Sequence, residues 1–218
     1  MSGFTGFENP TTPYREKPLN LGDIILRPAS TFIYQKAHSD RSVLVRKDDW
    51  VVVDASMKPE STDLVLAEQY GEQSIVPLAK IHNIQSELTV IGTATAIIRH
   101  HRPAPPLPKG KLQQELHAAL IPMPAAAFLS KANGSRMAGL GVRDNSLLIV
   151  RRDVDYQQGD LAVVYADNAF QCRLLNLSNG TLDDGLGIQT PITGPLAIEG
   201  VVTASISFQR QVIPQWQA

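Results

Sequence analysis

Two short stretches of the sequence decide how the rest is interpreted: Asp48-Asp-Trp-Val-Val-Val-Asp54 and Asn145-Ser-Leu-Leu-Ile-Val-Arg151. Each is a run of β-branched and large apolar residues bounded by polar turn residues, which predicts a strand. The two stretches are displaced by 97 residues, and so are Asp63-Leu-Val-Leu66 and Asp160-Leu-Ala-Val163. A constant displacement across two gapless blocks indicates an internal repeat.

The repeat continues on both sides of these blocks. Upstream, Pro28-Ala-Ser-Thr-Phe32 matches Pro124-Ala-Ala-Ala-Phe128 at a displacement of 96 residues. Downstream, Ile91-Gly-Thr-Ala-Thr95 matches Glu199-Gly-Val-Val-Thr203, after an insertion in the second copy around residues 178 to 194. We therefore expect two β domains of common origin, which superpose over residues of about 25 to 100 and 117 to 212.

The pattern elsewhere is also mainly that of strands. Helical periodicity is confined to the segment from Leu112 to Leu120. Trp50 is expected in the core or at a domain interface, and Cys172, which alternates with Phe170 in a strand, is expected to be a buried apolar residue. Further strands are predicted at Asp23–Leu26, Thr31–Tyr34, Ser42–Val45, Leu161–Tyr165 and Phe170–Leu174.

A proline-rich segment separates the two copies. The stretch His100-His-Arg-Pro-Ala-Pro-Pro-Leu-Pro-Lys109 contains four prolines, which favour an extended polyproline II spacer. The predicted organisation is an N-terminal arm (1–24), a first β domain (25–100), a linker (101–116) and a second β domain (117–212).

The composition is that of a soluble globular protein. Of the 218 residues, 43% are hydrophobic and 19% are charged, with a formal net charge of -1. This balance argues against a broad nucleic-acid-binding surface, which needs an excess of Lys and Arg. The sequence shows no signal peptide and no apolar run of membrane-helix length, so a cytoplasmic location is expected.

No metal or cofactor is expected. The single Cys172 lacks partners at zinc-ligand spacing, and the adjacent His100 and His101 would point to opposite faces of a strand. The glycines of Gly139-Leu140-Gly141 do not form a nucleotide-binding fingerprint and are expected to form a turn.

Four segments carry a resemblance to a known family. They are the segment from Leu19 to Phe32 in the first copy and, in the second, Lys131-Ala-Asn-Gly-Ser-Arg-Met137, the segment from Gly139 to Val150, and Gly159-Asp160. In these segments the sequence resembles UmuD and, more broadly, the LexA-like self-cleaving peptidases of the SOS response. The resemblance covers about nine-tenths of the chain as two successive matches. It implies two tandem curled β-sheet domains, arranged as an intramolecular pseudo-dimer.

The resemblance also implies that the catalytic dyad is lost. The family uses a serine nucleophile activated by a lysine, but Arg136 stands at the serine position of the second copy and Arg173 at the lysine position. A guanidinium is neither a nucleophile nor a general base. In the first copy the gapless nucleophile position is Asp40, between Ser39 and Arg41, and the base position is Val76. The sequence therefore predicts a pseudo-peptidase.

A partner-binding role follows from the same resemblance. UmuD-like proteins act as homodimers that associate with RecA filaments and a Y-family DNA polymerase, and one chain with two copies would supply both halves as a monomer. Five arginines could bind an acidic partner, or could form a solvated face: Arg136, Arg143, Arg151, Arg152 and Arg173.

Two alternatives are left open by the sequence. The first is a mobile-element antagonist or decoy that blocks host RecA, UmuD or LexA-type proteins through the same surface. The second is a working peptidase, in which Ser39 or Ser135 would be activated by a rearranged lysine.

Overall fold

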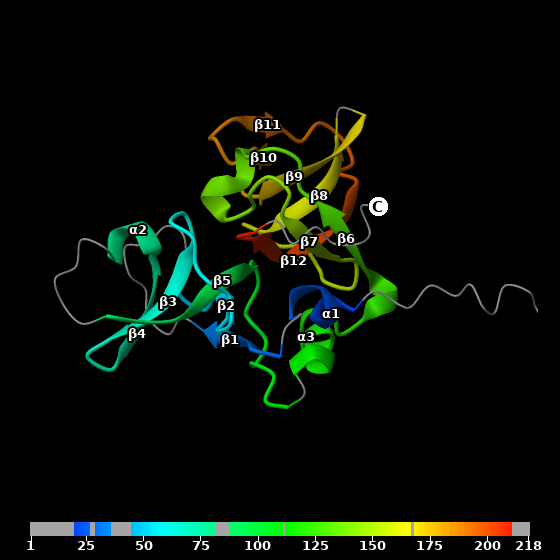
Figure 1. Ribbon diagram of the computed structural model, residues 1–218. Helices are drawn as coiled ribbons and strands as arrows, with labels where there is room; N and C mark the ends of the chain where they lie inside the picture. Colours follow the sequence, from blue (N-terminus) through cyan, green and yellow to red (C-terminus); the bar gives the residue numbers. More distant parts are fainter. Residues whose placement is uncertain are drawn as a thin grey trace, which may run out of the picture.

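The protein is mainly β, as predicted, and its described strands form one antiparallel sheet in the computed structural model (Figure 1). The structure describes residues 20–26, 29–35, 45–81, 88–110, 112–166 and 168–210, without the side chains of residues 113 and 114. The strand order along the sheet is β1-β2-β5-β12-β8-β9-β10-β11. Strand β3 pairs with β5 and β4, and β6 pairs with β7.

The chain divides the strands between its two halves. In the N-terminal half they are β1 (Thr31–Gln35), β2 (Trp50–Asp54), β3 (Leu64–Gln69), β4 (Glu72–Pro77) and β5 (Thr89–His100). In the C-terminal half they are β6 (Ala127–Lys131), β7 (Leu147–Arg151), β8 (Leu161–Ala166), β9 (Ala169–Asn176), β10 (Thr181–Asp183), β11 (Gln189–Pro191) and β12 (Ile198–Phe208). The helices are α1 (Leu21–Ile25), α2 (Leu78–Ile81), α3 (Leu112–Leu120) and the short 3-10 helices Pro124–Ala126 and Arg136–Leu140.

The same set of strand pairings occurs in each half. In the first half β1 pairs with β2, β2 with β5, β5 with β3, and β3 with β4. In the second half β6 pairs with β7, β7 with β12, β12 with β8, and β8 with β9. The long strands β5 and β12 pair with each other where the two halves meet, with Ile98 opposite Ile206 (Figure 1). The β10–β11 hairpin lies in the region where the sequence places the insertion.

Both long strands carry a β-bulge at a threonine. Thr95 is the extra residue of β5 opposite β2, and Thr203 is the extra residue of β12 opposite β7. The Thr95 hydroxyl donates to the carbonyl oxygen of Val52 at 3.3 Å, and the Thr203 hydroxyl donates to that of Ile149 at 3.4 Å. The two bulges therefore make the same hydrogen bond at matching places.

The strand predicted at Asp23–Leu26 is wrong, because this segment lies in helix α1 and its C-cap. The Asn20 side chain caps the helix by accepting from the Gly22 backbone nitrogen at 2.8 Å. Four of the five helix residues are buried, and the Leu21 backbone nitrogen donates to His117 Nδ1 of helix α3 at 3.3 Å. A short apolar run is compatible with either a helix or a strand, so the packing of this segment against α3 determines that it is helical. Helix α3 itself was predicted correctly.

The main core lies where the two halves join. Trp50 is fully buried in it, as predicted, and its ring meets the His100 ring edge-on at a centroid distance of 4.6 Å. The cluster combines residues of both halves: Leu21, Ile24, Ile25, Leu26, Trp50, Val52, Ala96, Ile98, Leu116, Leu120, Ile121, Leu147, Ile149, Ala204 and Ile206. Burial of apolar side chains from both halves in one cluster stabilises their association.

The segment between the halves packs on the sheet. Residues 101–110 form neither helix nor strand, and α3 begins at Leu112, inside the range predicted as a linker. The His101 backbone nitrogen donates to the Thr203 carbonyl oxygen at 2.9 Å. The strand predicted at Ser42–Val45 lies outside the described residues except for Val45, which is buried. Across the described ranges, no helix is long and apolar enough to cross a membrane.

Candidate functional site

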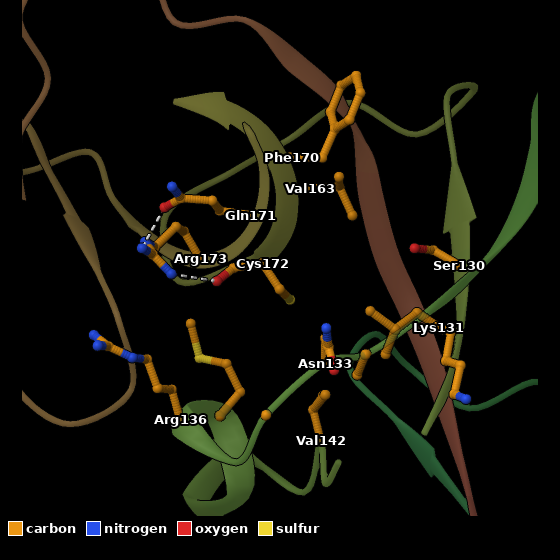
Figure 2. Close-up of a pocket in the computed structure, with 14 residues that line it drawn as sticks. Ser130, Lys131, Asn133, Arg136, Val142, Val163, Phe170, Gln171, Cys172 and Arg173 are labelled. Atoms are coloured by element: carbon orange, nitrogen blue, oxygen red, sulfur yellow. Dashed lines mark hydrogen bonds between the residues drawn. The ribbon is translucent and has the colours of Figure 1, made fainter. Parts of the chain in front are cut away.

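A pocket of about 280 Å³ lies in the C-terminal half, between the end of β6, the 3-10 helix Arg136–Leu140 and strand β9 (Figure 2). Phe170 stands at one end of it in this view. Its lining residues are Ser130, Lys131, Ala132, Asn133, Gly134, Arg136, Met137, Val142, Leu148, Val163, Phe170, Gln171, Cys172 and Arg173.

The structure brings Arg136 and Arg173 together at this pocket. Arg136 begins the 3-10 helix, and Arg173 lies on β9 opposite Ala162 of β8. Figure 2 shows both guanidinium groups on the same side of the pocket, with Lys131 on the other side. The two positions that the family resemblance assigns to nucleophile and base thus line one pocket, and both hold a guanidinium.

Arg136 is neutralised by a carboxylate. Its Nη1 lies 2.7 Å from Oδ2 of Asp184, whose side chain is only 5% exposed. Oδ1 of Asp184 accepts from the backbone nitrogens of Leu186 at 3.0 Å and Ile188 at 3.1 Å. These two backbone hydrogen bonds and Arg136 hold the pKa of Asp184 below its usual value, against the opposing effect of desolvation. The carboxylate therefore stays ionised and fixes the loop over the Arg136 turn.

Arg173 has different partners. Its Nη1 donates to the carbonyl oxygen of Cys172 at 3.1 Å, and its Nη2 donates to Oε1 of Gln171. Both acceptors are neutral, and within the described ranges the structure records no ion pair for Arg173. The side chain is half-buried, so its charge is only partly hydrated, and no carboxylate of the described residues pairs with it.

Cys172 lines the same pocket and is half-buried, whereas the sequence predicted a buried residue. Burial of the thiol raises the pKa of Cys172 to about 12, against a smaller opposing effect of the Arg173 charge. The thiol is therefore protonated at neutral pH and is a poor nucleophile.

The N-terminal half offers no equivalent pair of groups among the described residues. Val76 lies on β4 opposite Val65 of β3, which is the same place in the β3–β4 hairpin that Arg173 has in the β8–β9 hairpin. An aliphatic side chain at this position cannot accept a proton. Asp40, predicted at the nucleophile position, lies outside the described residues.

The other three arginines of the predicted set lie away from this pocket. Arg151 pairs with Asp153, and the ion pair raises the pKa of Arg151. Arg152 lies 3.2 Å from the carboxylate of Glu199, with its guanidinium carbon 4.6 Å from the centre of the Phe128 ring. Arg143 lines a small recess with Arg99. The five residues therefore do not form a single site.

Two ion pairs that the sequence analysis did not single out connect the halves. Arg102, after β5, pairs with Asp160, with 2.5 Å between Nη2 and Oδ2. Arg210, after β12, pairs with Asp63 through the same two atoms, also at 2.5 Å. Arg210 is also the main cause that holds the pKa of Asp63 below its usual value. The signal was present in the repeat, because Asp63 and Asp160 are matching residues and both long strands are followed closely by an arginine.

Among the described residues, no group of three or more His, Cys, Asp and Glu side chains could hold a metal ion. His101 instead places Nε2 at 2.9 Å from the Ser205 hydroxyl. Burial lowers the pKa of His101 to about 4, and the same cause lowers that of His100 to about 4.

Comparison with known proteins places the chain in a family. It is 39% identical over 72 residues to Protein ImpA of Escherichia coli, Salmonella typhimurium and Shigella flexneri, a match that covers 32% of this chain and 50% of ImpA. It is 30% identical over 110 residues to Protein SamA of Salmonella typhimurium strain LT2, which covers 50% of this chain and 79% of SamA.

The chain belongs to the UmuD-related family. This membership confirms the resemblance found in the sequence, at the level of the family. The chain spans about half the length of the ImpA relatives that it matches. No family model matches the chain.

Proposed function

We propose that this member of the UmuD-related family is a non-catalytic accessory protein of DNA-damage tolerance, which acts by binding a Y-family DNA polymerase, the RecA filament, or both. The observation that carries the proposal is the pair of arginines at the pocket. Arg136 and Arg173 both line the pocket and stand at the two positions that the sequence resemblance assigns to the family's nucleophile and base. Neither side chain can perform those steps.

Other groups at the pocket do not replace the dyad. Ser130 and Lys131 line it, but Lys131 is exposed, and a lysine must be desolvated to lose its proton near neutral pH. Cys172 is held as the neutral thiol by burial, which raises its pKa to about 12. The pocket is thus better suited to binding than to acyl transfer.

A tandem duplication, with the two halves paired as a pseudo-dimer, explains the matched contacts between them. In a two-fold interface, residue i of one partner contacts residue j of the other, and the reverse contact also occurs. The pair Arg102–Asp160 and the pair Arg210–Asp63 have this form. The reciprocal pairing extends to the backbone, because Arg102 also donates to a carbonyl oxygen at position 155 and Arg210 to one at position 58, which are themselves 97 residues apart.

Fusion would change how the paired state forms. Two separate chains must find each other, whereas two halves of one chain meet at a millimolar-range effective concentration set by the connecting segment. A paired UmuD-like surface would then be present at any expression level. This is a useful property for a protein that recruits partners after DNA damage.

The function is tested with purified protein and candidate partners. The chain is immobilised and exposed to a purified Y-family polymerase and, separately, to RecA filaments formed on single-stranded DNA with an ATP analogue. Saturable binding to one of them in the micromolar range or tighter is expected. Binding to neither would remove the proposed role.

The absence of catalysis is tested in the same preparations. Incubation at alkaline pH, and with RecA filaments at neutral pH, is expected to leave one intact band on a denaturing gel. A specific fragment that disappears in the Ser135→Ala or Ser39→Ala variant would show that the chain is a working serine peptidase.

A further inference from the structure

Arg173 carries a half-buried positive charge with only neutral partners among the described residues. Removing a guanidinium from bulk water costs free energy, and hydrogen bonds to neutral acceptors compensate for only part of this cost. Arg136, in the same pocket, differs because Asp184 neutralises it. A charge that has no carboxylate partner among the described residues, beside one that has such a partner, is suited to an anion from another molecule.

The pocket around Arg173 is positive at its rim and apolar inside. None of its lining residues is acidic, whereas Lys131, Arg136 and Arg173 are basic. The apolar lining is formed by Met137, Val142, Leu148, Val163 and Cys172. A volume of about 280 Å³ accommodates a few side chains. A carboxylate with an apolar side chain beside it would satisfy both parts of the pocket.

Exposed apolar residues continue from the pocket onto the surface. Phe170 lines the pocket but is 66% exposed, and its ring meets that of Tyr165 edge-on at a centroid distance of 5.2 Å. Leu186 is 67% exposed and Ile188 is 60% exposed, on the loop that Asp184 ties to Arg136. Aromatic and arginine side chains are enriched at protein interfaces, so this rim favours a protein partner over a small free anion.

A nucleic acid fits the surface less well. Its affinity depends on many unpaired cations along the phosphate backbone. Here Arg151 and Arg152 are paired with carboxylates, and the whole chain has a formal net charge of -1.

We infer that the pocket binds an acidic segment of a partner protein, with one carboxylate on Arg173 and a neighbouring apolar side chain on the Met137–Val142 surface. The inference rests on the proposed function as a binding protein, and adds the chemistry by which the partner is recognised. It also divides the arginines of the second half. Arg136 and Arg173 contribute to the interface, while Arg143, Arg151 and Arg152 do not.

The test uses two labelled peptides and the full chain. The first is a fluorescein-labelled peptide of eight residues with two acidic residues between two leucines, and the second has the two acidic residues replaced by their amides. Fluorescence anisotropy should show saturable binding of the acidic peptide and at least tenfold weaker binding of the amide peptide. Equal binding of the two peptides, or saturable binding of neither, would overturn the inference.

Two variants locate the binding. Arg173→Gln should weaken binding of the acidic peptide at least tenfold. Arg152→Gln, whose side chain contacts Glu199 and Phe128 outside the pocket, should bind as the unchanged chain does. Arg173→Gln should also unfold at the same or a higher urea concentration than the unchanged chain, because an unpaired half-buried charge is removed. Unchanged binding by Arg173→Gln would place the site elsewhere.

The outcomes are separable from those of the proposed function. Inorganic phosphate is added as a competitor, and displacement of the acidic peptide by low millimolar phosphate would mean a general anion site, which contradicts the inference. If the acidic peptide fails to bind while the polymerase or RecA filament binds, the pocket assignment is wrong and the function stands. If the peptide binds and neither protein does, the pocket stands and its partner is another acidic protein.

Discussion

Arg99 on β5 and Asp49 just before β2 form a buried ion pair, with 2.7 Å between Nη2 of Arg99 and Oδ2 of Asp49. Their side chains are 8% and 3% exposed. In the second half, Ser207 and Ser146 lie at the places that correspond to Arg99 and Asp49, and their hydroxyl oxygens are 2.9 Å apart. The two halves therefore have the same set of strand pairings but differ in the chemistry of this buried contact.

This difference predicts unequal costs for substitutions at matching sites. Asp49→Asn removes the negative charge that lies against the buried Arg99 guanidinium, which should lower the free energy of unfolding by about 3–5 kcal/mol. Ser146→Ala removes one neutral hydrogen bond and should cost about 1 kcal/mol. Urea unfolding of the two variants measures both values, and equal losses would show that the ion pair does not stabilise the first half.

A second prediction concerns Gly141, which approaches the same arginine. Gly141 has φ of +93°, and a Cβ there would lie 2.0 Å from Nη1 of Arg99. Gly141→Ala must therefore displace the buried Arg99 as well as strain the backbone. Gly159 is the matched control, because it has φ of +83° and a Cβ added there would meet nothing within 4 Å.

The expected losses of unfolding free energy differ accordingly. Gly159→Ala should cost about 1–2 kcal/mol from the left-handed backbone alone. Gly141→Ala should cost at least about 2 kcal/mol more, because it disturbs a buried ion pair. Similar urea midpoints for the two variants would mean that Arg99 can move aside freely.

Much of the fold could be predicted because the decisive signals are local. The strands around Trp50 and Leu147 are dense in β-branched or large apolar residues, and their displacement of 97 residues recurs in the matched pairings of β2 and β7. Helix α1 could not be predicted in this way. Its five residues are compatible with either state, and the choice depends on burial against α3, which begins 87 residues after the end of α1.

The site was predictable in part for the same reason. The motif spacing placed Arg136 and Arg173 at matching family positions, and the structure brings both to one pocket. The sequence could not tell which arginine is neutralised. Asp184 lies in the inserted hairpin region, 48 residues from Arg136, and no repeat partner indicates where that loop folds. The distinction between a paired and an unpaired charge depends on such long-range contacts.

A third prediction is a loss of stability between neutral and mildly acidic pH. Burial lowers the pKa of His100 to about 4 and that of His101 to about 4, whereas an unfolded histidine titrates near 6.5. Between these values the unfolded chain binds more protons, so the free energy of unfolding should fall as the pH falls. From pH 7 to 4.5 the loss should be about 2–3 kcal/mol per histidine.

The second half supplies the control for this effect. Phe208 and Gln209 at the end of β12 correspond to His100 and His101 at the end of β5. The correspondence follows from matching hydrogen bonds: the Gln209 backbone nitrogen donates to the Thr95 carbonyl oxygen, and the His101 backbone nitrogen donates to the Thr203 carbonyl oxygen. The double variant His100→Phe and His101→Gln should flatten the pH dependence measured by urea unfolding. Carboxylates such as Asp63, whose pKa is lowered, lose their contribution only below about pH 4, outside this window. If the free energy of unfolding of the double variant falls with pH as steeply as that of the unchanged chain, groups other than these two histidines cause the loss.

The last prediction is that the chain is monomeric in solution. Strand β5 pairs with β12 of the same chain, and the main core contains side chains from both halves, so the surfaces at which these two strands could pair with a second chain are already occupied. Light scattering at micromolar concentration should give a mass near 23.8 kDa. The variant with Arg102→Gln and Arg210→Gln removes the ion pairs that these two arginines make with Asp160, Asp63 and Glu60 of the opposite half. It should lower stability yet remain monomeric, because the strand pairing and the shared core persist. A stable species of twice the mass in the unchanged chain would show that the halves pair between chains, and would contradict the intramolecular arrangement.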